Sequence, residues 1–238
     1  MARLPRLSVA GVPHLVEQCG HNGQALFLDS ADLRVYREIL LEATSASGVA
    51  LHAYLLDTAR VLLLATPRDS KVLSRMIQRV ARRYTVEFNR RHERSGTIWS
   101  GRFRSTLLQP GTCFIAAMCH VESDAALAGD GSAADGQRIS SVAHHLGLVV
   151  DPLVSDHALF WALGNTPFER HAAYGLLAMQ PISPEERRRF DDAVRKGWAL
   201  GTEAFLAEIA EASSRRVRPL TAGRPRKPTR AGGHHCVP

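Results

Sequence analysis

Short apolar segments alternate with longer amphipathic ones along the first half of the chain. Four segments have the length and composition of β-strands: residues 13–19, 49–56, 61–66 and 102–108. Asp57-Thr58-Ala59 joins the second segment to the third closely enough for a hairpin. Gly20-His21-Asn22-Gly23 and Gly96 mark turns beside the others. The pattern therefore predicts four strands.

Between the strands, apolar residues that recur at three- and four-residue spacing predict two helices. The first begins at a cap formed by Asp29 or Ser30 and ends near Ser47-Gly48. The second buries a stripe made of Leu73, Met76, Ile77, Val80, Tyr84 and Phe88. The resulting order, βαββαβ, predicts an α+β fold: a ferredoxin-like antiparallel sheet with helices on one face.

The chain beyond the fourth strand is mainly helical in pattern. Residues 113–121 predict one helix, residues 129–136 form a loop of small residues, and residues 184–196 and 202–212 predict two more helices. We therefore expect three parts. These are a sheet domain over residues 1–130, a helical C-terminal extension over 131–212, and a basic, disordered tail over 213–238.

The composition, with 45% hydrophobic and 22% charged residues, is that of a globular protein. No apolar run approaches the roughly 18 residues of a membrane span, so we expect no membrane partner. The basic N-terminus leads into no long apolar region, so we expect no signal peptide and a cytoplasmic location. The four cysteines form no Cys-x-x-Cys pair and predict free thiols.

The net charge of +7 is concentrated in two segments. Residues 71–108 hold ten basic residues and two acids, and residues 213–238 hold seven basic residues and no acid. Ordinary surfaces mix both signs, so these segments predict contact with a polyanion, and we expect nucleic acid. In the first segment the candidate contacts are Arg75, Arg79, Arg82, Arg83, Asn89, Arg90, Arg91, Arg102 and Arg104, with Trp99 and Phe103 as stacking faces.

In the tail, Arg224, Arg226 and Lys227 lie in the sequence Gly-Arg-Pro-Arg-Lys-Pro. Prolines hold such a strip extended, and it resembles the core of an AT-hook, which lies in a narrow A·T minor groove. A generic basic tail is the alternative interpretation.

Several motifs together are more specific. They include Leu51-His52-Ala53-Tyr54, the stretch from Arg82 to His92, the segment Trp99-x-Gly101-Arg102-Phe103-Arg104-Ser105, Ser140-Ser141-x-Ala143-His144-His145 and residues 161–168. In these residues and their order, the chain through Lys227 resembles the REP-associated tyrosine transposases, a family of single-tyrosine HUH transposases of bacterial insertion sequences.

The resemblance implies a lineage that binds hairpin-forming single-stranded DNA and cuts it with a tyrosine. Two histidines that flank one hydrophobic residue hold Mg²⁺ or Mn²⁺ at the scissile phosphate in that family. The resemblance also implies DNA contacts at the turn formed by Gly20, His21 and Asn22. It leaves a monomer and a homodimer open.

The catalytic positions depart from the family pattern. Arg60 and Leu62 stand at the two histidine positions, His120 replaces the tyrosine, and Asp124 stands where a third metal ligand would lie. Leucine offers no lone pair, and arginine repels a cation, so we expect no metal here. Tyr36, Tyr54, Tyr84 and Tyr174 have sequence contexts that fit packing better than catalysis.

The sequence therefore predicts a transposase-like DNA-binding protein that has lost cleavage and uses no cofactor. Two alternatives stay open at this point. One is an active transposase with a rewired centre at His120 and Asp124, since histidine can attack phosphorus. The other is a decaying remnant without function.

Overall fold

This computed structural model describes residues 6–126, 138–213 and 216–218 of the chain. Its first part contains the strands and helices in the predicted order: β1 (His14–Cys19), α1 (Ser30–Ser47), β2 (Ala50–Asp57), β3 (Arg60–Thr66), α2 (Val72–Arg91) and β4 (Arg104–Leu107). A single 3-10 turn, η1 (His21–Gly23), follows β1.

The later elements follow the predicted helical pattern: α3 (Pro110–Ala126), β5 (Ile139–Ser140), α4 (Val142–His145), α5 (Ala158–Trp161), α6 (Pro167–Ala178), α7 (Pro184–Lys196) and α8 (Glu203–Ser213). The predicted loop at residues 129–136 and the domain boundary near residue 130 lie outside the described residues, and the three-part division stays a prediction.

The sheet has the strand order β4-β1-β3-β2-β5, and every pair in it is antiparallel. The first four strands have the predicted ferredoxin-like order, and the two-residue strand β5 extends the sheet beside β2. Glu17 of β1 lies opposite both Leu62 and Arg104, so these three side chains share one face of the sheet. The α+β fold class is confirmed.

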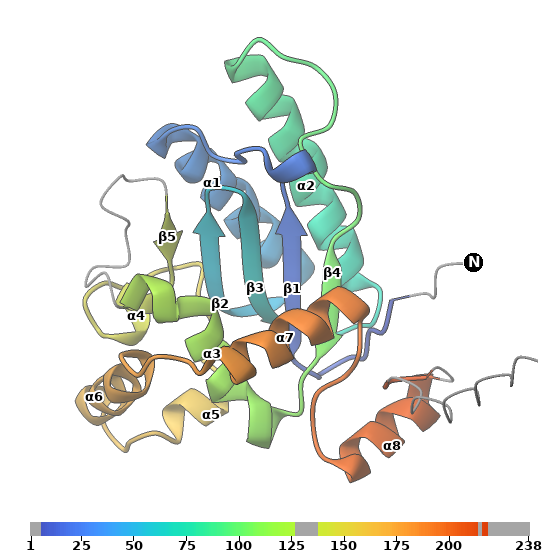
Figure 1. Cartoon of the computed structure of the whole chain (residues 1–238). Coiled ribbons are helices and arrows are strands. Elements are labelled where there is room, and N and C mark those ends of the chain that lie inside the picture. Colours follow the sequence, from blue (N-terminus) through green and yellow to red (C-terminus); the bar gives the residue numbers. More distant parts are fainter. Residues whose placement is uncertain (1–5, 127–137, 214–215, 219–238) are drawn as a thin grey trace, which may run out of the picture.

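Helices α1 and α2 cover one face of the sheet, as predicted, and lie behind the strands in Figure 1. Tyr36 of α1 and Tyr84 of α2 meet edge to face, with ring centroids 5.0 Å apart, above Val16, Leu63 and other strand residues. The side chain of Asp29 caps α1 by accepting the N–H of Asp32 at 2.9 Å, as the sequence indicated.

The structure adds a second layer that the sequence did not predict, because α3 and helices of the extension pack on the opposite face. Leu55, Leu62 and Leu64 of the sheet share a buried cluster with Phe114 of α3 and Phe190 of α7. The strands β2 and β3 therefore bury both faces, which explains why they are apolar at nearly every position.

A buried carboxylate ties this second layer together. Glu122 of α3 is fully buried and accepts hydrogen bonds from the Ser141 hydroxyl, from His145 Nδ1 at 2.9 Å and from the Tyr174 hydroxyl at 2.5 Å. Three donors satisfy a charge that would be very costly to bury alone. Through these bonds Glu122 fixes three segments to α3: the turn that follows β5, helix α4 and helix α6.

Candidate nucleic-acid interface

The outer face of α2 carries arginines because its inner face is used for the core. Six apolar residues of this helix are buried, and the residues between them point outward. Arg75, Arg79 and Arg82 are exposed, and no ion pair joins any of them to a carboxylate in the described part of the chain. At 1.5 Å rise per residue, the stripe from Arg75 to Arg82 extends about 10 Å.

Other basic residues of α2 are already paired. Arg83 bonds Glu42 of α1, and Arg90 lies 2.6 Å from Glu87. The hydrogen bond from Arg83 lowers the pKa of Glu42. Because these cations are partly neutralised by their neighbours, they contribute less field to a polyanion than the three unpaired arginines do.

Arg91 performs a structural role at the end of α2. Its guanidinium lies 3.0 Å from Asp29 and also bonds Asp32, while His92 Nε2 lies 2.9 Å from Asp32. Asp32 also accepts the N–H of Leu28. Although two carboxylates and a histidine meet here, their lone pairs are used by the protein itself, so this cluster joins α1 to α2.

The predicted contact turn lies beside the loop that precedes β4. His21 N donates to Ile98 O at 2.9 Å, and Ser100 N donates to Cys19 O at 2.9 Å. Gly20 forms a bridge with Trp99, and its backbone is closely packed against Gln24. His21 and Asn22 are exposed at this edge. The turn and the loop thus form one surface.

Two aromatic residues of that loop serve as core rather than as stacking faces. Trp99 is only 6% exposed, and its indole N–H donates to Ala81 O at 3.1 Å and to Thr85 Oγ1 at 3.0 Å. Phe103 is buried beneath the Arg6 guanidinium, which lies 3.7 Å from the ring centroid. The expectation that these rings stack on bases is corrected, because neither presents a free face.

Asn89 also supports the loop, since its Nδ2 donates to Gly96 O at 2.8 Å. Arg102 is exposed and lines a shallow groove with Glu17, Cys19, Ser100 and Arg104. The groove connects the loop to the front face of the sheet.

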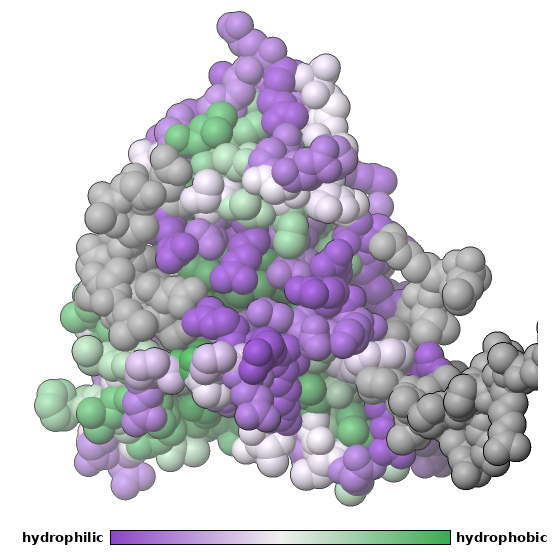
Figure 2. All heavy atoms as spheres, in the orientation of Figure 1, coloured by the Kyte–Doolittle hydropathy of each residue, from purple (hydrophilic) through white to green (hydrophobic). Residues whose placement is uncertain are grey.

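The front of the sheet above α3 and α7 is polar. In Figure 2 hydrophilic side chains gather there, in the same view as Figure 1. Arg60 lies opposite Cys19 and 3.5 Å from Asp57, and Asp57 also pairs with Arg138 at 3.0 Å. Arg104 lies 3.9 Å from Glu17. Glu17, Asp57 and Arg138 carry no local sequence signal for this site, because the folding of the sheet brings them to this face.

The changed catalytic positions lie on this same face. Leu62 is buried among apolar residues that include Leu55 and Cys119, and Arg60 is engaged with Asp57. These two residues do not fit a divalent cation, because one lacks a ligand atom and the other brings a positive charge. Asp124 lies in α3.

His120 projects from α3 toward α7 and away from solvent. It is 4% exposed, stacks on Phe190 with ring centroids 4.9 Å apart, and has its Nε2 3.6 Å from Asp191 Oδ1. Phe190 and Asp191 of α7 therefore cover this imidazole and leave little of it open to a phosphate.

None of the chain's four tyrosines offers a replacement nucleophile. All four are 2% exposed or less, and burial raises the pKa of each of them. The Cys19 thiol, which is closer to the groove, has its pKa raised by burial and then by the Glu17 charge, so it stays protonated at neutral pH. The described residues of this face therefore present cations but no activated nucleophile.

The tail residues Arg224, Arg226 and Lys227 lie outside the described residues, and their role stays a prediction. No helix in the described ranges combines the length and apolar character that crossing a bilayer requires.

No protein-family model matches this chain, and no curated protein matches it. A solved transposase structure is similar to it. That structure, of the REP-associated tyrosine transposase bound to a REP hairpin, has a TM-score of 0.46 and 12% sequence identity, over 54% of this chain and 75% of its own. Similarity at this level assigns no role to individual residues, so function has to be inferred from the side chains.

Proposed function

We propose that this protein is a transposase-like DNA-binding protein that holds hairpin or single-stranded DNA without cutting it. The observation that carries the proposal is the stripe of three exposed arginines on α2 without carboxylate partners among the described residues. An arginine already bonded to a carboxylate gains little by binding a phosphate, because it must give up the carboxylate. An unpaired arginine neutralises the phosphate directly, and the counterions condensed on the DNA are released. The stripe is therefore the primary contact with the DNA backbone.

The second contact is the surface formed by η1, Arg102 and the polar front of the sheet. Arg60 would bind a phosphate there by giving up the Asp57 carboxylate, since the guanidinium offers the same donors to either oxyanion; the gain is smaller than that of an unpaired arginine, so this contact is secondary. The exposed turn at His21 and Asn22 supplies backbone and side-chain donors at the edge of this surface.

The loss of cleavage rests on geometry at the changed positions. A tyrosine or histidine nucleophile gains from a Lewis acid only when both converge on one phosphate. Here Leu62 lies in the core and His120 lies beneath Phe190, which supports a protein that binds DNA and leaves it intact.

Binding is tested by fluorescence anisotropy with the full-length protein and three labelled DNAs: a hairpin, an unpaired strand of equal length and a duplex. We expect the hairpin or the unpaired strand to bind more tightly than the duplex, with affinity that falls linearly in log[salt]. Equal binding of all three would contradict the preference for single strands. Binding of none at low salt would contradict the function.

A further inference from the structure

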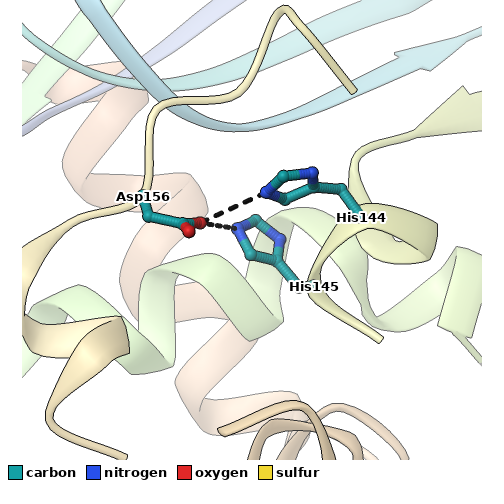
Figure 3. A group of neighbouring side chains, drawn as sticks. All are labelled: His144, His145 and Asp156. Atoms are coloured by element: carbon teal, nitrogen blue, oxygen red, sulfur yellow. Dashed lines mark hydrogen bonds and ion pairs between the residues drawn. The ribbon is translucent and has the colours of Figure 1, made fainter. Parts of the chain in front are cut away.

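We propose that His144, His145 and Asp156 form a site for a divalent transition metal of the zinc class. The site belongs to the extension and does not depend on DNA binding. All three side chains converge in Figure 3, two from α4 and one from the loop that precedes α5. Adjacent histidines on a long helix point apart, but α4 has only four residues and the loop returns to meet both rings.

The distances fit a tetrahedral ion. His144 Nε2 lies 3.2 Å from Asp156 Oδ1, His145 Nε2 lies 3.9 Å from the same oxygen, and one ligand atom of each residue lies within 4.8 Å of the others. Ligands about 2.0–2.1 Å from Zn²⁺ in tetrahedral geometry lie roughly 3.4 Å apart. Small side-chain adjustments would therefore suffice, and a water molecule would complete four-coordination.

His145 provides the independent evidence for a ligand. Its side chain is 1% exposed, its Nδ1 bonds Glu122 at 2.9 Å, and its Nε2 is buried without a hydrogen-bond partner. The Nδ1–H donates a hydrogen bond to the Glu122 carboxylate, so the second ring nitrogen, Nε2, faces Asp156 Oδ1 at 3.9 Å without a hydrogen bond. A carboxylate behind a histidine is the usual support of a metal-bound imidazole.

Asp156 is held in the matching orientation. Trp161 Nε1 donates to its Oδ2 at 3.2 Å, which leaves Oδ1 facing the two histidines. The Asp156 and His144 side chains are 28% and 17% exposed, so an ion can enter from solvent.

His144 is not oriented for a metal as well as His145 is, because its Nδ1 already accepts a hydrogen bond from the backbone. The backbone N–H of Asp151 donates to its Nδ1 at 3.1 Å, so Nε2 carries the proton when no metal is bound. Coordination through Nε2 displaces that proton and breaks the Asp151 hydrogen bond. We therefore expect His145 and Asp156 to dominate the affinity and His144 to contribute less.

The test is Co²⁺ and Zn²⁺ titration of the full-length chain. Its background carries His234→Gln, His235→Gln and Cys236→Ser, which remove competing ligands in the tail. Binding of one Co²⁺ ion should produce the visible bands of tetrahedral coordination, and Zn²⁺ should displace it. Asp156→Asn, which keeps the size of the side chain, should weaken binding at least roughly tenfold. His144→Gln should weaken it less, and His21→Gln on the exposed turn should not change it.

Replacing the buried His145 imidazole threatens folding, so a His145→Gln variant must be checked by circular dichroism. The partly exposed Asp156 carries less of this risk, so the Asp156→Asn variant decides whether the metal site exists. Failure of the tail-substituted chain to bind Co²⁺ would overturn the proposal. Equal affinity in the Asp156→Asn variant would overturn it as well. Neither result bears on DNA affinity, which is measured separately.

Discussion

Arg75, Arg79 and Arg82 of α2 have no carboxylate partner among the described residues, whereas Arg83 and Arg90 each have one. This difference gives a quantitative prediction. The test variant replaces Arg75, Arg79 and Arg82 with glutamine, which keeps helix propensity and removes the charge. The matched control is the charge-neutral double variant Glu42→Gln with Arg83→Gln, which removes one exposed ion pair from the same surface.

The magnitude follows from counterion release. Each phosphate contact contributes about 0.7 to the salt slope for single-stranded DNA and about 0.9 for duplex. Three lost contacts should therefore lower the slope by about two to three and the affinity near 0.15 M salt by roughly a hundredfold. The control should leave the slope nearly unchanged, because Arg83 is already bonded to Glu42.

The assay is hairpin-DNA anisotropy over a series of salt concentrations, with thermal unfolding to show that both variants fold. An exposed ion pair is worth about 0–1 kcal/mol, so the control should unfold near the wild-type temperature. An unchanged slope in the triple variant would refute the reasoning. So would equal losses in the triple variant and the control, because the surface would then respond to charge in general.

Three further predictions concern stability. Trp99→Phe should lose about 1–3 kcal/mol in denaturant unfolding because a buried indole N–H bond to Ala81 O disappears, while the salt slope of DNA binding stays unchanged. Tyr174→Phe should cost a similar amount, about 1–3 kcal/mol, because Glu122 loses one of its three donors; wild-type stability would contradict that arrangement. Burial lowers the pKa of His14 to about 4. Between about pH 6.5 and pH 4 this histidine is therefore protonated in the unfolded chain and neutral in the folded chain. Stability should fall as the pH drops through this window, by up to about 3 kcal/mol from this residue, and His14→Gln should lose that share of the pH dependence.

Local signals in the sequence were enough for the first half of the fold. The stripe from Leu73 to Phe88 has a helical period, and Gly48 ends α1 with a φ of 65° that favours glycine. Both signals act over a few residues, so they survive any tertiary arrangement. The same is true of the hairpin at Asp57-Thr58-Ala59.

The second layer could not be predicted in this way, because its contacts join residues far apart in the chain. Glu122 meets Tyr174 across 52 positions. The unbroken apolar run Val61 to Ala65 was the available signal in the sequence, since a strand without polar alternation indicates a sheet covered on both faces.

Only part of the candidate interface could be predicted, because the pairing of its arginines also depends on contacts between residues far apart in the chain. Composition located the basic helix, but the pairing of Arg83 with Glu42 and of Arg91 with Asp29 depends on how α1 packs against α2. Trp99 looks like a stacking residue in the sequence, and only its position beneath Thr85 and Ala81 shows that it is core. Charge count therefore overestimates the free cations on this surface.

The most direct test of binding without cleavage is one incubation with two readouts. The full-length protein is mixed with labelled hairpin DNA that carries flanking strands, in Mg²⁺ or Mn²⁺, and the products are separated on native and on denaturing gels. We predict a retarded complex on the native gel and intact, unlinked DNA on the denaturing gel. A covalent protein–DNA adduct that disappears in His120→Ala would contradict the account and establish a rewired active centre.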